Sequence, residues 1–146
     1  MSWTLVTAFD VHGEPKGQPR PRAFSRHGKA RVYNPGTAEG WKGAIALAAR
    51  EHLPASPIDA PIKLAISFFF ARPKRLEAKK SAPGNIPHIA KPDADNAAKA
   101  VMDCLTEIGM WRDDALVMSL YAEKQYAAKG TPAGALIQIF KMEELP

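Results

Sequence analysis

The sequence predicts an α+β fold in which a mixed β-sheet carries two principal helices. Three observations predict this class. Residues 62–70 alternate apolar side chains over the length of a strand, two longer segments have the apolar spacing of helices, and the strand-like and helix-like segments follow one another in mixed order. The chain has 146 residues, of which 46% are hydrophobic and 24% charged, so we expect residues 1–146 to form a single domain with a packed core.

The N-terminal third should be mostly extended. Residues 3–11 alternate apolar and polar side chains, which predicts a strand. Residues 13–22 contain three prolines and two glycines and should form no regular element. A short strand is expected around residues 30–33, followed by a turn at Asn34-Pro35-Gly36.

The first helix should begin after Thr37, which is a favourable N-cap residue, and end near Leu53. Its expected apolar stripe consists of Trp41, Ile45, Ala48 and Ala49. Residues 54–61, which have a proline at each end, should then act as a linker to the strand at residues 62–70.

Residues 71–92 show no periodicity and contain four prolines. Structureless loops this long are uncommon in compact domains and are usually either functional or disordered. We therefore expect a disordered basic loop that becomes ordered when a ligand binds.

The second helix should run from Asp93 to Gly109, a residue type that favours the position after a helix. One expected face is apolar, and the opposite face is polar. The apolar face consists of Ala97, Val101, Cys104, Leu105 and Ile108, and the polar face of Asp95, Lys99, Asp103 and Thr106. The lone Cys104 should be a buried thiol.

Two strands should complete the sheet. They cover residues 116–126 and 135–142, and a turn at residues 129–132 separates them. We expect them to pair as an antiparallel hairpin, whereas strands separated by a helix can pair in parallel.

Positive charge is concentrated in two segments of the chain. Residues 15–31 and 71–92 hold 12 of the 20 Lys and Arg residues, while the rest of the chain is acidic on balance. This distribution suits a surface that grips a polyanion such as nucleic acid, although solvated loops could have the same composition.

Carboxylates gather between Lys91 and Val117. Asp93 and Asp95 stand at the expected helix start, and Asp113 and Asp114 precede the next strand. Each pair has a structural explanation, as a helix cap with a favourable dipole contact or as a turn. Lys99, one turn from Asp95, could belong to an ion-pair ladder or stand as a catalytic cation beside a metal.

Magnesium prefers hard oxygen ligands and is commonly held by one or two carboxylates together with water and substrate phosphate oxygens. Two aspartates at the helix start, joined by a third from a neighbouring strand end, could supply such a site. The four histidines are scattered and form no pattern typical of zinc. The combination of metal and positive charge indicates phosphate chemistry.

The motif Lys91-Pro92-Asp93-Ala94-Asp95-Asn96, with Lys99, Asp103 and Trp111-Arg112-Asp113-Asp114, resembles the RusA-type Holliday junction resolvases, which phages and prophages often carry. Gly13-x-Pro15, Arg20-Pro21-Arg22 and Val32-Tyr33-Asn34-Pro35 resemble the opening of that family, so the likeness covers nearly the whole chain. Ala94 and Ala97-Ala98 depart from it, because larger aliphatic residues are more usual there.

The resemblance implies a RusA-like fold and a homodimer that resolves four-way DNA junctions in recombination and repair. It implies paired, Mg²⁺-dependent incisions that leave 5′-phosphates, with Mn²⁺ as a substitute. The metal-binding and catalytic aspartates would be Asp93, Asp95 and Asp114, and Lys99 would be the essential lysine. Asp113 could support or replace Asp114.

The basic segments should supply affinity for DNA through phosphate contacts. The expected contacts are Arg20, Arg22, Lys74, Arg75, Lys79, Lys80 and Lys91. We see no signal peptide and no apolar stretch that could span a membrane, and we expect a cytoplasmic protein. Two alternatives remain open, which are a non-catalytic nucleic-acid-binding protein and a metal-dependent nuclease acting on flaps, RNA or other branched substrates.

Overall fold

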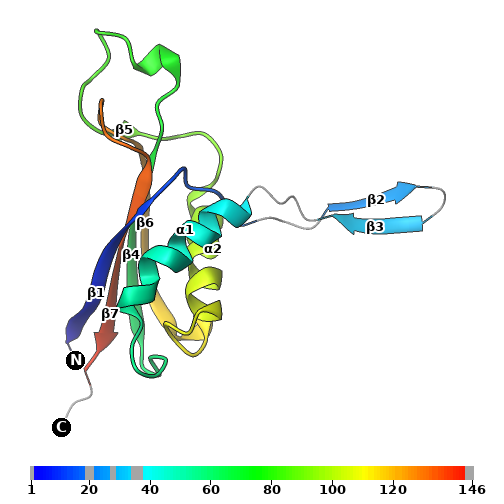
Figure 1. The fold of residues 1–146 in the computed structure, drawn as a ribbon, viewed down its shortest axis with the longest axis vertical. Coiled ribbons are helices and arrows are strands. Elements are labelled where there is room, and N and C mark those ends of the chain that lie inside the picture. Colours follow the sequence, from blue (N-terminus) through cyan, green and yellow to red (C-terminus); the bar gives the residue numbers. More distant parts are fainter. Residues whose placement is uncertain (1, 19–21, 27–28, 34–37, 144–146) are drawn as a thin grey trace.

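The fold is a five-stranded mixed sheet with two helices packed on it, as the sequence predicted (Figure 1). The structure is a computed structural model that describes residues 2–18, 22–26, 29–33 and 38–143; of residues 22–26 and 29–33 it describes the backbone alone. In the sheet, the strands lie in the order β1 (Trp3–His12), β7 (Gly134–Met142), β4 (Ile62–Phe70), β6 (Val117–Tyr126) and β5 (Ile86–Pro87).

Strand β4 is the centre of the sheet. It pairs in parallel with β6 and antiparallel with β7, while β7 pairs antiparallel with β1. The apolar residues that alternate along β4 point to the helices and are at most 3% exposed: Ile62, Leu64, Ile66, Phe68 and Phe70. Period-two alternation with one buried face therefore fixed this strand, as expected.

The prediction that the last two strands pair as a hairpin is wrong. Strand β4 lies between β6 and β7 and separates them. A turn was correctly expected near residues 129–132, but the whole link covers residues 127–133, which is long enough to pass the end of β4. By placing β4 between them, the fold buries the most apolar strand of the chain at the sheet centre.

Helices α1 (Glu39–Ala49) and α2 (Ala94–Glu107) both cover the same face of the sheet (Figure 1). Helix α1 has Ala38 at its N-cap position and continues as a 3₁₀ turn over Arg50–His52. Thr37, predicted to cap this helix, and the predicted turn at residues 34–36 lie outside the described residues. Of the predicted stripe, Trp41, Ile45 and Ala49 are buried and Ala48 is partly buried.

Helix α2 buries its predicted apolar face, on which Ala97, Val101, Cys104 and Leu105 are at most 3% exposed. Ile108 is the C-cap residue of this helix, and Gly109 follows with a φ of 87°, the left-handed conformation that glycine adopts readily. Burial raises the pKa of the Cys104 thiol, with a smaller contribution from Glu107. The prediction of a buried, free thiol is confirmed.

A two-stranded hairpin extends away from the sheet and helices in Figure 1. It consists of β2 (Arg22–Arg26) and β3 (Lys29–Tyr33), paired antiparallel. The short strand around residues 30–33 was predicted and is confirmed, whereas β2 was missed. The irregular stretch predicted for residues 13–22 holds over 13–18, but Arg22 already belongs to β2.

The loop at residues 71–92 is ordered, contrary to the expectation of disorder before ligand binding. It contains a 3₁₀ turn (Lys74–Leu76) and strand β5, which pairs with β6. The Arg72 guanidinium donates to the carbonyls of Ala127, Leu76 and Gly84, and Lys129 Nζ donates to two more carbonyls of the loop. These hydrogen bonds from side chains to backbone carbonyls stabilise a loop whose sequence has no periodic pattern.

Candidate active site

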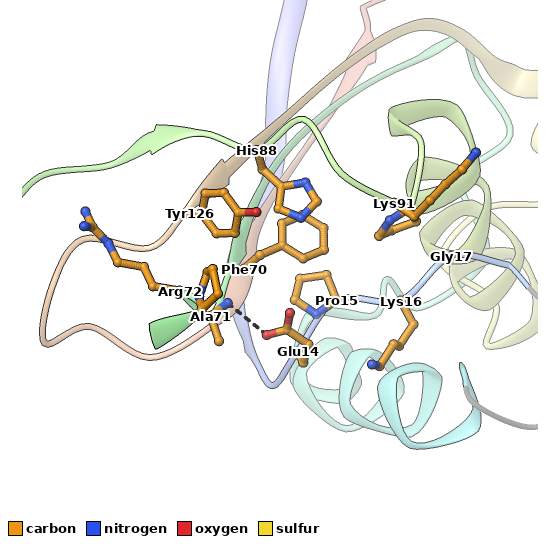
Figure 2. A pocket seen from close by; sticks show the side chains of 12 residues that line it. Glu14, Pro15, Lys16, Gly17, Phe70, Ala71, Arg72, His88, Lys91 and Tyr126 are labelled. Atoms are coloured by element: carbon orange, nitrogen blue, oxygen red, sulfur yellow. Dashed lines mark hydrogen bonds between the residues drawn. The ribbon is translucent and has the colours of Figure 1, made fainter. Parts of the chain in front are cut away.

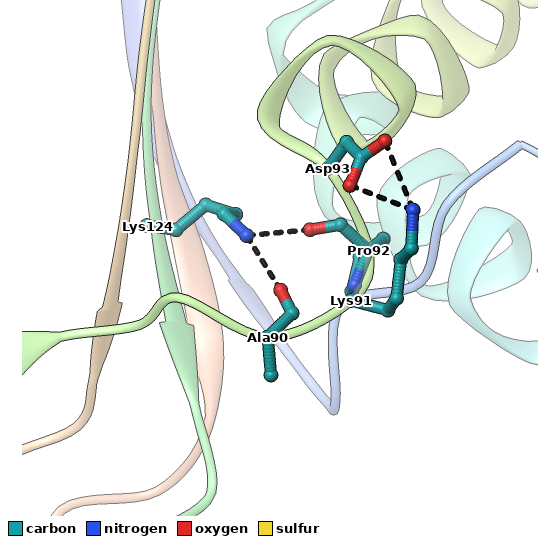
Figure 3. Close-up of polar contacts among 5 residues, drawn as sticks. All are labelled: Ala90, Lys91, Pro92, Asp93 and Lys124. Atoms are coloured by element: carbon teal, nitrogen blue, oxygen red, sulfur yellow. Dashed lines mark hydrogen bonds and ion pairs between the residues drawn. The ribbon is translucent and has the colours of Figure 1, made fainter.

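The start of α2 presents the carboxylate of Asp93 to solvent. Asp93 occupies the N-cap position, but its side chain makes no capping hydrogen bond. Lys91 Nζ donates to Asp93 Oδ1 at 3.0 Å and to Oδ2 at 3.2 Å instead (Figure 3). The capping explanation therefore does not account for this carboxylate, which is 54% exposed.

Lys124 on β6 holds the backbone that leads into α2. Its ammonium donates to the carbonyl of Ala90 at 2.7 Å and to that of Pro92 at 2.6 Å (Figure 3). Lys124 was not among the predicted site residues. The register of β4 and β6 pairs Lys124 with buried Phe68 on the helix-facing side of the sheet, where a lysine needs fixed partners. No local sequence pattern indicates this register.

The polar face of α2 continues from Asp95 towards the C-terminal end of the helix. Asp95 lies exposed in the first turn, where the helix dipole favours a negative charge. Lys99 is equally spaced in sequence from Asp95 and Asp103, and the structure pairs its Nζ with Asp103 Oδ1 at 3.5 Å. Lys99 itself stays 61% exposed, so a ligand can reach its ammonium.

Asp114 is held against the C-terminal part of α2 by two donors. The Thr106 hydroxyl donates to Asp114 Oδ1, and Trp111 Nε1 donates to Thr106 Oγ1 at 2.7 Å and lies 3.4 Å from Asp114 Oδ1. Trp111 is fully buried, so its indole N–H has a fixed position. These contacts aim one carboxylate oxygen from outside the helix at the polar face of α2.

Asp113 has a different environment from Asp114. Its Oδ1 accepts a hydrogen bond from the Ala115 backbone N–H at 2.8 Å and caps the short 3₁₀ turn Asp114–Leu116. The turn explanation that the sequence offered for this acidic pair therefore applies to Asp113.

The pKa of Asp103 is raised in the folded protein. Burial is the main reason that the pKa of Asp103 is raised, and a hydrogen bond with Asp114 raises it further, whereas Lys99 opposes the shift. Asp103 was placed on the polar face by the sequence but was not chosen as a site residue.

The predicted carboxylates thus lie in two groups along one face of α2. Asp93 and Asp95 are at its start, and Asp114 lies beside Asp103 and Thr106. Eight residues of helix separate Asp95 from Asp103, which corresponds to about 12 Å along the axis. Among the described residues, no three His, Cys, Asp or Glu side chains are grouped closely enough to hold a metal ion.

The donor chemistry at the helix start nevertheless fits a hard divalent cation. Asp93 and Asp95 offer exposed carboxylate oxygens, which is the ligand type and number that protein-bound Mg²⁺ commonly uses. Their exposure leaves room for the water molecules and phosphate oxygens that such an ion needs. Asp114 offers a third carboxylate oxygen at the other end of the polar face.

Of the predicted DNA contacts, Lys91 lies nearest in sequence to the start of α2. Lys91 is exposed and adjoins the site, and the other described candidates are exposed in the loop that precedes it: Lys74, Arg75, Lys79 and Lys80. Arg20 lies outside the described residues, and only the backbone of Arg22 is described. The neighbouring Arg72 has a structural role, as described above.

Comparisons with known proteins show which family the chain belongs to. Residues 12–139 match the family model described as "Endodeoxyribonuclease RusA", which covers most of the chain. The chain therefore belongs to the RusA endodeoxyribonuclease family. It is also similar to the uncharacterized protein YqaN of Bacillus subtilis (strain 168), with 32% identity over 124 residues, 82% of this chain and 87% of that protein. In the described part of the chain, no helix combines the length and apolarity that crossing a membrane requires.

Proposed function

We propose that this protein is a Mg²⁺-dependent endonuclease that resolves four-way DNA junctions by paired incisions. The observation that carries the proposal is the exposed Asp93–Asp95 pair at the start of α2, flanked in sequence by Lys91 and Lys99, in which the Asp93 side chain makes no capping hydrogen bond. Membership of the RusA family supports the same chemistry.

Asp93 and Asp95 are the residues proposed to hold the divalent cation, and Asp114 is the third carboxylate. When bound, such a cation polarises a scissile phosphate and lowers the pKa of a coordinated water. Mn²⁺, which accepts similar oxygen ligands, should substitute for Mg²⁺.

Lys99 is proposed to stabilise negative charge on the phosphate or on the leaving oxygen. Its ammonium is exposed and reaches Asp103 through a contact of 3.5 Å, a long and weak ion pair. A phosphate that approaches the helix start can therefore draw Lys99 away at low cost. Fixed positive charge near a developing oxyanion is typically a large contribution to catalysis.

The basic loop and Lys91 supply affinity without reading sequence. Lys74, Arg75, Lys79 and Lys80 project from a loop that internal hydrogen bonds hold in place, so their charges form a preorganised surface. Phosphate contacts of this kind make binding strongly salt-dependent. Replacing all four with Gln should flatten the dependence of junction affinity on salt concentration.

A homodimer is the assembly that paired, symmetric incisions require. The outer edge of β6 supports this proposal, because β5 covers only its last residues and, among the described residues, no strand pairs with the rest of that edge. Met118, Leu120 and Tyr121 on β6 are large and exposed. An open strand edge with apolar side chains is a template for pairing with another chain.

The test is a cleavage panel with four-way junctions, flaps, duplex DNA and RNA, with Mg²⁺ or EDTA present. Wild-type protein should cut junctions in pairs, only with the metal, and Asp95→Asn should bind junctions at least as tightly while losing cleavage by about a thousandfold or more. Full activity in EDTA, or wild-type turnover by Asp95→Asn, would refute the proposal. Tight binding without cleavage would identify a non-catalytic DNA-binding protein.

A further inference from the structure

A pocket of about 370 Å³ reaches Lys91, two residues before the proposed metal ligand Asp93 (Figure 2). It opens at the carboxyl ends of the parallel strands β4 and β6, where open α/β sheets commonly bind ligands. Four parts of the chain form its walls, which are residues 14–17, residues 70–73, residues between β5 and α2, and Tyr126 at the end of β6. Lys91 and Pro92 line the pocket, and they directly precede Asp93 in the chain. A ligand bound in the pocket therefore lies close to the start of α2.

One wall of the pocket is aromatic. The rings of Phe70 and His88 stack with centroids 3.8 Å apart and an interplanar angle of 16°, and Tyr126 packs against His88 at 4.7 Å. Phe70 and His88 are buried, whereas Tyr126 remains partly exposed and offers its ring to the pocket. A partly exposed aromatic ring such as that of Tyr126 can stack on the flat face of a nucleobase.

His88 itself is not explained by packing alone. His88 is only 7% exposed and is the one polar side chain buried to this extent among the described residues. Its Nδ1 has no hydrogen-bond partner. Burial is the main cause that lowers the pKa of His88, with the nearby charge of Lys124 as a second cause, so the ring is neutral at physiological pH. A buried polar atom without a partner is costly, and such atoms often mark functional sites.

The opposite wall carries charge. Lys16 and Lys91 flank the opening, and Glu14 lies between the two walls, where its Oε2 accepts a hydrogen bond from the Ala71 backbone N–H at 3.0 Å (Figure 2). This bond fixes the Glu14 carboxylate and leaves Oε1 as an acceptor for an amino group. The two ammonium groups suit the phosphates on either side of a bound nucleotide.

The segment that carries Glu14 and Lys16 is anchored to the catalytic helix. Gln18 N–H donates to the carbonyl of Asn96 at 3.2 Å, and Gly17 packs so closely that a Cβ there would collide with the Asn96 side chain. The pocket and the start of α2 therefore form one unit.

We propose that this pocket receives an unstacked nucleobase bearing an exocyclic amino group, from the strand whose phosphate lies at Asp93 and Asp95. The inference rests on the proposed function and adds a base-recognition site to it. The base stacks on Tyr126, its amino group donates to Glu14, and Lys16 and Lys91 hold the adjoining phosphates. Thymine lacks such an amino group and should be the poorest occupant.

The experiment measures junction binding in EDTA, so that catalysis is not needed. A single abasic site is moved through the strands near the crossover, with wild-type protein, Tyr126→Leu and the matched control Tyr126→Phe. One position should weaken wild-type and Tyr126→Phe binding about 5- to 100-fold, the usual value of one stacked base. Tyr126→Leu should already be weak and should lose little more at that position.

Base identity is tested at the same position. Wild-type protein should bind the thymine junction several-fold more weakly than the other three, and Glu14→Gln should reduce this difference because an amide both donates and accepts. Glu51→Gln, which changes an exposed carboxylate in the 3₁₀ turn after α1 and outside the pocket lining, is the control and should keep the difference. The pocket inference alone would be overturned if no abasic position weakened binding by the wild-type protein. It would also be overturned if the abasic site weakened binding by Tyr126→Leu and by the wild type equally. Failure to bind junctions at all would overturn the proposed function.

Discussion

At the scale of single residues, the orientation of Asp114 depends on a buried indole. Trp111 Nε1 donates to the Thr106 hydroxyl, which in turn donates to Asp114. Partners that orient a metal-binding carboxylate typically change metal affinity 10- to 100-fold when they are removed. Trp111 is therefore a positioning residue whose N–H matters apart from its packing.

We predict that Trp111→Phe raises the Mg²⁺ concentration for half-maximal cleavage about tenfold. Cleavage at saturating Mg²⁺ and junction binding in EDTA should change little, because no group that contacts DNA is lost. Trp41→Phe is a matched control, since Trp41 is equally buried but its Nε1 has no partner among the described residues. An equal shift in both variants would show that the effect comes from lost volume.

Asp103 supports a prediction about pH. Its pKa is raised mainly by burial and then by Asp114, so the folded state disfavours the charged form that the unfolded state accepts. Asp103 therefore reduces stability above its unfolded pKa, near 3.8, and the cost grows until the pH passes the higher folded value.

Asp103→Asn should remove this cost, because a neutral amide carries no charge to desolvate. We expect its melting temperature at pH 7 to exceed that of the wild type by about 2–4 °C, the shift that roughly 1 kcal/mol produces in a domain of this size. The difference should shrink as the pH falls through 3.8 and vanish well below it, where the wild-type side chain is protonated in both states. A constant gain at all pH values would contradict this account.

At the scale of elements, sequence periodicity predicted most of the sheet and both helices. The bounds of β4 follow from unbroken alternation between residues 62 and 70, and α2 follows from its apolar face and Gly109. Periodicity reports which face of an element is buried, but it carries no information on which strands become neighbours. The separation of β6 from β7 by β4 was therefore outside its reach.

The candidate site was predictable to the same extent. The position of Asp93 before the helix and the spacing of Asp95, Lys99 and Asp103 on one polar face are local to a helix and are found in the structure. Lys124 and Glu14 were missed because their contacts join segments far apart in the chain, and no local pattern encodes such contacts. The order of the 71–92 loop was missed for the same reason, since Arg72 and Lys129 fix it through carbonyls.

The pairing of β1 with β7 depends on a close backbone approach at Gly134. A Cβ at this position would collide with the carbonyl oxygen of Val11, which belongs to the backbone and cannot move aside alone. We predict that Gly134→Ala destabilises the protein by about 2 kcal/mol or more, measured by urea unfolding. Gly43→Ala in α1, where a Cβ meets nothing within 4 Å, should instead be neutral or stabilising by up to about 1 kcal/mol.

At the scale of the whole molecule, the open edge of β6 is the surface expected to form the dimer. Met118→Glu combined with Leu120→Glu should shift the protein from dimer to monomer in sedimentation equilibrium, because like charges would face one another across a two-fold axis. Leu47→Glu, which changes an exposed residue of α1, is the control and should stay dimeric. Dimers of unchanged stability in the double variant would exclude this edge as the interface.

The separation of the carboxylates along α2 leads to a prediction about how subunits share an active site. Ligands of one Mg²⁺ ion each lie about 2.1 Å from it, whereas about 12 Å of helix separates Asp95 from the level of Asp103 and Asp114. One chain cannot close this gap without unwinding α2. In a two-fold dimer, Asp93 and Asp95 of one subunit can instead meet Asp114 of the partner subunit.

Dimers that combine one Asp95→Asn subunit with one Asp114→Asn subunit distinguish the two arrangements. If carboxylates are shared between subunits, one of the two sites in the mixed dimer is intact and the other carries both substitutions. We therefore expect the mixed dimer to nick one strand of a junction, whereas the Asp95→Asn and Asp114→Asn homodimers should cut no strand. The mixed dimer is isolated with two affinity tags. If each site used one chain only, both sites of the mixed dimer would be damaged, and it would be as inactive as its parents. Denaturing gels of a junction labelled on all four strands separate a single nick from paired cutting and from none.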